Sequence, residues 1–67
     1  MLKHYLIDVT SLSEDEYNRF QTFLEGYAHN FATDLNGTFE ILLDESRPLE
    51  GLPQVPASCK ITLLSKM

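Results

Sequence analysis

The side chains best suited to chemistry in this chain are one cysteine and two histidines, Cys59, His4 and His29. His29 follows Glu25 by four residues, which places both on one face of a helix, but a metal site needs three or four ligands and no third is evident. His4 and Asp8 share one face of an extended segment, yet the rise of a strand separates them by about 13 Å. We therefore expect no metal site, and we expect both histidines to lie on the surface.

Cys59 is the one thiol of the chain. It shares strand parity with Ile61 and Leu63, which predicts partial burial, and the adjacent Lys60 points to the opposite face. A reactive thiolate needs a positive neighbourhood and a base, and a lone cysteine forms no internal disulfide. The sequence also contains no glycine-rich phosphate loop, nucleophile elbow or His-Glu-x-x-His motif. We expect no catalytic residue, no cofactor and no enzymatic activity.

Ten acidic and five basic residues give the chain a net charge of −5. Nucleic acids and anionic membranes attract basic surfaces, so direct binding to either is disfavoured. No apolar run approaches the roughly 20 residues of a membrane-spanning helix, and the N-terminal segment does not have the pattern of a signal peptide. Together with the free thiol, this favours a cytoplasmic location. A length of 67 residues, 43% of them hydrophobic, predicts one small domain over residues 1–67.

A capping box predicts where the helix begins. Ser13 and Glu16 have the Ser-x-x-Glu spacing, and Leu12 and Tyr17 flank the cap as a hydrophobic staple. Apolar residues then recur at intervals of three and four, as on the buried face of an amphipathic helix: Tyr17, Phe20, Leu24, Tyr27, Ala28, Phe31 and Leu35. This stripe predicts a helix over residues 13–35.

The end of this helix has two interpretations. Asn36-Gly37 suits both the residues that follow a helix and a two-residue hairpin turn. The hairpin would set Asp34 opposite Phe39 and would mix polar and apolar residues on each face. We therefore favour the longer helix. The alternative is a helix that ends near Asn30 and is followed by an Asn-Gly hairpin.

Alternating apolar residues predict three strands, over residues 2–10, 38–44 and 59–65, and all three prolines fall in a loop over residues 45–58. This order defines the fold class α+β: a two-layer β-α-β-β domain, whose three-stranded mixed sheet has one long helix on one face. The helix should make a right-handed crossover between the first two strands, and the third strand should lie between them. The strand residues expected in the core are Tyr5, Ile7, Val9, Phe39, Ile41, Leu43, Ile61 and Leu63.

One helix covers only one face of such a sheet. The other face holds three leucines among polar residues, which is more apolar than a sheet face in solvent needs to be. Two interpretations stay open: the 45–58 loop folds over this face, or the face and the loop bind a partner. The predicted protein-interaction residues are His4, Leu6, Glu40, Leu42 and Leu64 in the strands, and Leu49, Leu52 and Val55 in the loop.

These features favour a small protein-binding module that contacts another protein, itself, or both. Small acidic domains without catalytic residues are typical of accessory proteins of phages and plasmids, including inhibitors of host proteins. The acidic helix offers a further hypothesis, competition with nucleic acid for a protein groove, against the simpler interpretation of a solvated helix face. The alternatives are a structural homodimer formed through the open sheet face, and a ligand-binding or catalytic site at a dimer interface. The residues expected to converge at such a dimer interface are His4, Asp8, Glu40 and Lys60.

Overall fold

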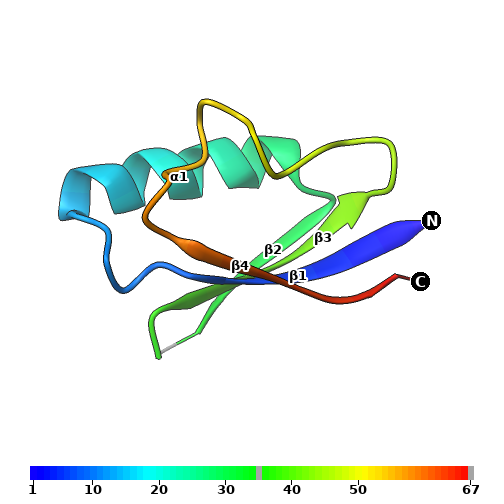
Figure 1. Cartoon of the computed structure of the whole chain (residues 1–67), viewed down its shortest axis with the longest axis horizontal. Helices are drawn as coiled ribbons and strands as arrows, with labels where there is room; N and C mark the ends of the chain where they lie inside the picture. Colours follow the sequence, from blue (N-terminus) through cyan, green and yellow to red (C-terminus); the bar gives the residue numbers. More distant parts are fainter. Residues whose placement is uncertain (35, 67) are drawn as a thin grey trace.

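The computed structural model describes residues 1–34 and 36–66 and confirms the α+β class. The elements follow the order β1 (Leu2–Asp8), α1 (Glu14–Tyr27), β2 (Asn30–Asp34), β3 (Thr38–Asp44) and β4 (Lys60–Lys66). The four strands form one sheet in the order β2-β3-β1-β4, and every neighbouring pair is antiparallel. The helix packs on one face of this sheet (Figure 1). In the described part of the chain, no helix is long and apolar enough to cross a membrane.

The predicted start of the helix is confirmed. Ser13 is the N-cap: the Glu16 amide donates to its hydroxyl at 3.2 Å, and its own amide donates to the Glu16 carboxylate at 3.1 Å. This reciprocal pair satisfies two amides that the first helical turn leaves without partners. Phe20 and Leu24 are fully buried beneath α1, in agreement with the predicted stripe.

The predicted end of the helix is wrong. The chain leaves the helix at Ala28, whose ψ of 152° is extended, and Phe31 and Ala32 belong to strand β2. The alternative interpretation, a shorter helix followed by a hairpin, describes the structure better. Three residues rather than two separate β2 from β3, and the third of them, Gly37, has a φ of 82°. The expected helical position of Leu35 lies outside the described residues.

The longer connection shifts the hairpin by one residue from the register of a two-residue turn, in which Asp34 would lie opposite Phe39. Phe31 pairs with Ile41, and Thr33 pairs with Phe39. A shift of one residue moves every side chain of a strand to the other face. In the observed register Phe31, Phe39, Ile41 and Leu43 share the helix side with Thr33 as the one polar residue, and only Ala32 and Leu42 of the apolar residues fall on the other side, so the mixing of polar and apolar residues that argued against a hairpin is much reduced.

The extra strand also changes the topology. Strands β1 and β2 both run antiparallel to β3, so the crossover through α1 joins two strands that have β3 between them. The predicted three-stranded mixed sheet is therefore a four-stranded antiparallel sheet. The first strand lies between β3 and β4, so the expected order, with the last strand in the middle, is wrong.

The core lies between the sheet and the helix. Phe39 is at its centre, with its ring 5.0 Å from Tyr17, 5.8 Å from Phe20 and 5.0 Å from Phe31, measured between centroids. The buried hydrophobic residues are Tyr5, Ile7, Val9, Phe20, Leu24, Phe39, Ile41, Leu43 and Leu49. Ile61 packs against this core, but Leu63 is 45% exposed and its predicted place in the core is wrong. Leu63 lies on the outer strand β4, so it has no further strand beside it to cover it.

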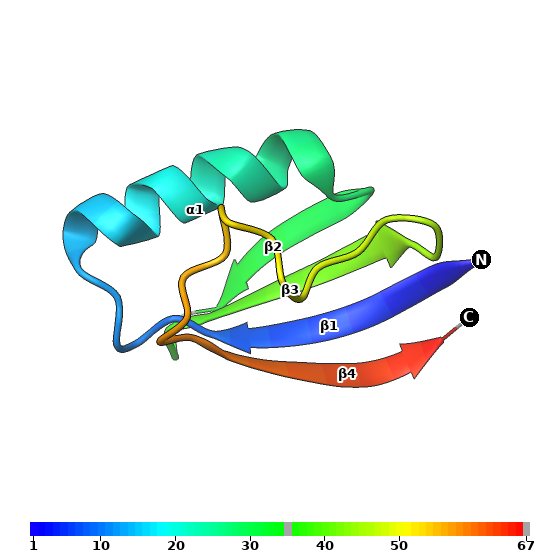
Figure 2. The ribbon, with the colours of Figure 1, turned by 45° about the horizontal axis from the view of Figure 1, so that its top comes forward.

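The 45–58 loop lies on the same side of the sheet as α1 (Figures 1 and 2). Its Leu49 is 1% exposed, and Val55 packs against the core. The Tyr27 hydroxyl donates to the Pro48 carbonyl at 2.6 Å, and the Arg47 guanidinium donates to the Tyr27 carbonyl at 2.7 Å. The helix is too short to cover four strands, and the loop completes the layer. The interpretation that this loop covers the other sheet face is therefore wrong.

Gly26 supports a first prediction. It lies in α1, it is exposed, and a Cβ added there meets nothing within 4 Å. Gly26→Ala should stabilise the domain by up to about 1 kcal/mol, because alanine loses less backbone entropy in a helix. For a domain of this size that is a rise in melting temperature of roughly 4–8 °C, measured by circular dichroism. A lower melting temperature would show that the backbone at position 26 needs the conformational freedom of glycine.

Candidate functional site: the open face of the sheet

The open face is the side of the sheet turned away from α1 and the 45–58 loop. Strand alternation and register arrange its residues in rows across the sheet. In the order β2, β3, β1, β4 the rows read Asp34–Thr38–Asp8–Lys60, then Ala32–Glu40–Leu6–Thr62, then Asn30–Leu42–His4–Ser65, with Asp44 opposite Leu2 beyond them. Ala32, Leu6 and Leu42 lie in the two middle rows, and four of the six outermost positions are charged.

A polar pair lies at the centre of this face. His4 Nε2 is 2.8 Å from Glu40 Oε2, and the two side chains are 26% and 52% exposed. They are diagonal neighbours on strands β1 and β3, a distance that long side chains can bridge. The half-buried Leu6 and Leu42 occupy the other diagonal. His4 and Glu40 were expected to converge only across a dimer interface, whereas the pairing of β1 with β3 brings them together within one chain.

The open face carries an excess of negative charge. Its carboxylates are Asp8, Asp34, Glu40 and Asp44, and Lys60 is opposite Asp8. Hydrogen bonds from the Thr10 hydroxyl at 2.6 Å and the Thr10 amide at 3.0 Å lower the pKa of Asp8. Bonds from the amide and hydroxyl of Ser46 lower the pKa of Asp44 in the same way. Both carboxylates are therefore fully charged at neutral pH.

Two adjoining hollows run along β2 and β3 on this face. One has a volume of about 360 Å³ and lies beside His4 and Leu42; the other, of about 300 Å³, lies beside Leu6 and Asp34. Ala32 and Glu40 line both. The cause is the difference in side-chain size between strands: β2 presents short side chains here, whereas β3 and β1 present leucines and a histidine. The hollows together form a trough beside the edge strand.

The structure brings together only part of the predicted interaction site. His4, Leu6, Glu40 and Leu42 form one patch at the centre of the open face. Leu64 lies at the sheet edge in a bulge of β4, where the register with β1 shifts, and it is 48% exposed.

The three predicted loop residues lie on the opposite side of the molecule. Leu49 belongs to the core and offers no free surface, and Val55 is half-buried against that core. Leu52 is half-buried in the same loop. In turn, Ala32 and Asp34 belong to the open face but were assigned to the helix. The sequence signal that could have placed them is Gly37, which suits the last position of a three-residue hairpin loop as well as the second position of a two-residue one.

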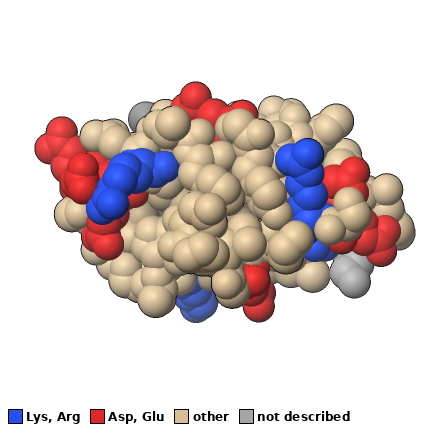
Figure 3. Space-filling view, turned by 90° about the horizontal axis from the view of Figure 1, so that it is seen from above, with Lys and Arg blue, Asp and Glu red and all other residues tan. Residues whose placement is uncertain are grey.

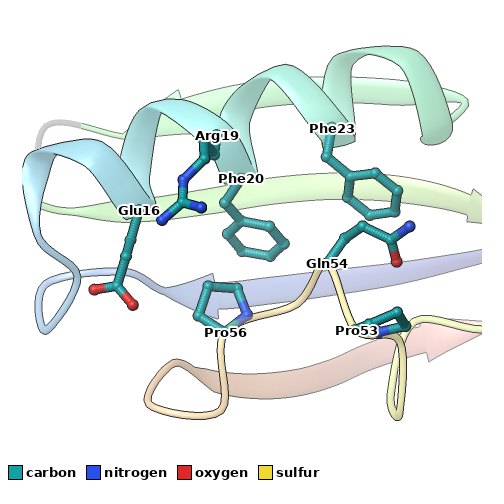
Figure 4. Close-up of a pocket in the computed structure, with 7 residues that line it drawn as sticks. All are labelled: Glu16, Arg19, Phe20, Phe23, Pro53, Gln54 and Pro56. Atoms are coloured by element: carbon teal, nitrogen blue, oxygen red, sulfur yellow. The ribbon is translucent and has the colours of Figure 1, made fainter.

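A second groove lies between α1 and the 45–58 loop (Figure 4). It has a volume of about 310 Å³ and is lined by Glu16, Arg19, Phe20, Phe23, Pro53, Gln54 and Pro56. Its charged groups already have partners, since Glu16 closes the capping box and Arg19 is 3.0 Å from Asp15. On this side of the molecule the charged side chains gather mainly toward the two ends, and the middle is mostly uncharged (Figure 3).

The observed helix is less acidic than the helix predicted over residues 13–35. Helix α1 carries four carboxylates against Arg19, because Asp34 belongs to the sheet. Three of the four lie in the first turn, where they stabilise the positive end of the helix dipole. Among residues 1–34 and 36–66, no three His, Cys, Asp or Glu side chains are placed to hold a metal ion.

Cys59 gives a second prediction. Its Sγ is 2.9 Å from the Pro56 carbonyl oxygen, and burial raises the pKa of the thiol. Because the thiolate is the nucleophile, we expect iodoacetamide to alkylate Cys59 at pH 8 several times more slowly in the folded chain than in urea. The difference should shrink as the pH rises and the folded thiol ionises. Equal rates at pH 8 would show that the thiol is neither shielded nor perturbed.

Comparisons with protein-family models, with curated proteins and with solved structures found no match to this chain. Function must therefore be inferred from the described surfaces. The open face offers half-buried apolar side chains, a trough and an excess of carboxylates. These are features that suit contact with another macromolecule.

Proposed function

We propose that this chain is a small cytoplasmic protein-binding module without catalytic activity, and that it contacts its partner through the open face. One observation carries the proposal: α1 and the 45–58 loop both pack on the other side of the sheet, so no described segment covers this face. Its residues Leu2, Leu6 and Leu42 are only half-buried. Apolar side chains that a monomer leaves uncovered on a contiguous surface often mark an interaction site.

The size and charge of the face restrict the partner. Four strands of this length present about 400 Å² at ordinary strand spacing, so an interface limited to them would bury roughly 800 Å² in total, below the usual range for stable complexes. A partner must therefore bind transiently or also contact the rim. The carboxylates of the face disfavour nucleic acid, and they disfavour a second copy because it would bring the same charges.

Within this class, an accessory protein of a phage or plasmid that inhibits a host protein is the particular role we favour. A short acidic chain with one exposed contact face suits the occupation of a site on a larger protein. This part of the proposal is an association between size, charge and role. The identity of a captured partner would test it directly.

The test is capture from source-cell lysate with tagged chain, read by mass spectrometry. We expect one stoichiometric partner, and we expect Leu6→Glu to reduce its capture at least about tenfold, since a charge replaces an apolar contact at the centre of the face. Ala57→Glu is the matched control, because Ala57 is exposed in the loop on the opposite side. Circular dichroism verifies that both variants fold.

Two outcomes would contradict the proposal. Undiminished capture by the Leu6→Glu variant would remove the open face from the interaction. The second outcome is recovery of the bait alone, together with a dimeric mass in light scattering that becomes monomeric in the Leu6→Glu variant. That result would show that the chain is a homodimer rather than a module that binds another protein. In that case the face would be occupied by a second copy.

A further inference from the structure

We propose that the open face receives a basic amphipathic helix of another protein. This inference rests on the proposed function and specifies the chemistry of the partner. An apolar side chain of that helix would enter the trough over Ala32, and lysine or arginine side chains beside it would meet Glu40 and Asp34.

The shape of the trough supports a helix. The two hollows share Ala32 and Glu40 and extend along three successive rows of the sheet, a length of about 13 Å at ordinary strand rise. A helix advances by about 5.4 Å per turn and is about 10 Å across, so two to three turns fit this length. The trough follows β2 and β3, and His4 and Leu6 bound it on the side of β1. A trough of this form suits a cylindrical helix of the partner better than a flat partner surface.

The lining of the trough supports apolar contact at its centre. Ala32 lines both hollows together with Glu40; Leu42 lies diagonally beside Ala32, and Leu6 lies beyond Glu40 in the same row. A leucine or isoleucine seated there would cover apolar area that the isolated domain leaves in water, which is the main source of affinity in such grooves. Several apolar residues spaced three and four apart on the partner would match the rows of the sheet.

The charge of the face determines the sign of the charge that the partner must carry. Glu40 and Asp34 line the hollows, whereas no lysine or arginine does. Lys60 lies on the far strand β4, at the opposite side of the sheet. Glu40 is 52% exposed, so it can accept a further hydrogen bond while it remains bonded to His4. A cationic segment therefore complements the trough, and an acidic segment or a second copy of this chain opposes it.

The experiment uses two synthetic helical peptides with the same leucine pattern, one with lysine and one with glutamate at the polar positions. Binding to the full chain is followed by fluorescence anisotropy. We expect the leucine–lysine peptide to bind and the leucine–glutamate peptide not to bind. We expect the double variant Glu40→Gln, Asp34→Asn to weaken binding of the lysine peptide at least about tenfold. Glutamine at position 40 keeps a hydrogen-bonding partner for His4, so the fold should be unchanged.

The matched control is the double variant Glu14→Gln, Glu25→Gln, which removes the same charge from exposed positions of α1. It should change the affinity less than about threefold, because rim charges remote from a contact contribute little. Equal loss in both double variants would show non-specific attraction by net charge and would overturn the inference. Equal binding of the two peptides, or binding of neither, would overturn it as well.

The two proposals fail in distinguishable ways. If Leu6→Glu abolishes capture of a lysate partner while the peptides show no preference for lysine, the open face is the interface and the proposal of a basic helical partner is wrong. If Leu6→Glu leaves that capture intact, the proposed function itself is wrong. Nuclear magnetic resonance locates the peptide independently: shifts at Ala32, Glu40 and Leu42 support the trough, and shifts confined to the groove beside Phe23 refute it.

Discussion

Leu49→Ala should lower the free energy of unfolding by about 2–5 kcal/mol, the usual cost of truncating a fully buried leucine. Leu49 is 1% exposed and belongs to the hydrophobic core, although the loop that carries it has no regular strand or helix. A domain of this length has a total stability of roughly 3–10 kcal/mol, so the variant should be largely unfolded at modest urea concentrations. Urea denaturation followed by circular dichroism measures the change.

Leu52→Ala is the matched control for Leu49→Ala, since Leu52 is a half-buried leucine three residues along the same loop. It should cost under about 1.5 kcal/mol because less apolar surface is lost. The contrast tests whether the 45–58 loop is part of the core or a separable segment. If both substitutions have the same small effect, the loop does not anchor the fold and the assignment of Leu49 to the core is wrong.

The helix start was predictable from the sequence and the helix end was not, for a physical reason. The capping box is local: Ser13 and Glu16 satisfy each other's amides within one turn. At the other end, the Tyr27 carbonyl accepts a hydrogen bond from Arg47, twenty residues further along the chain. In addition, Phe31 continues the helical spacing although it belongs to an edge strand. A five-residue strand offers too few alternating positions to outweigh that coincidence.

Local sequence patterns also could not predict which face of the sheet the 45–58 loop covers. Leu49 and Val55 show that the loop has apolar side chains to bury, but both faces of the sheet could receive them. The choice follows from the length of α1: a 14-residue helix leaves part of its own side of the sheet uncovered, and the loop fills that part. A helix that continued to residue 35, as predicted, would have left less room there.

The candidate site was predictable where it depended on alternation within one strand, and not where it depended on pairing between strands. Alternation placed His4 and Leu6 on one side of β1, and Glu40 and Leu42 on one side of β3, as the structure has them. The contact between His4 and Glu40 requires the β1–β3 register. The trough requires β2, whose short side chains were assigned to a helix.

Gly37→Ala should destabilise the domain by more than the about 1–3 kcal/mol that a non-glycine residue costs in a left-handed conformation. Gly37 has a φ of 82°, and its carbonyl accepts a hydrogen bond from the Val9 amide at 3.0 Å, so the hairpin corner is tied to the end of β1. An added Cβ would lie 2.5 Å from the Thr10 methyl carbon, which is too close for non-bonded carbons. Strain and collision therefore add at this position.

Gly51→Ala separates the two contributions. Gly51 has a φ of 85°, but a Cβ there meets nothing within 4 Å, so its substitution reports the backbone strain alone. Thr10→Ser removes the colliding methyl and keeps the hydroxyl that donates to Asp8 at 2.6 Å. In the Thr10→Ser background, Gly37→Ala should cost about the same as Gly51→Ala, and the difference between the backgrounds measures the collision as a coupling free energy. No coupling would mean that a Cβ at position 37 does not meet the Thr10 methyl, and that the cost of Gly37→Ala is backbone strain alone.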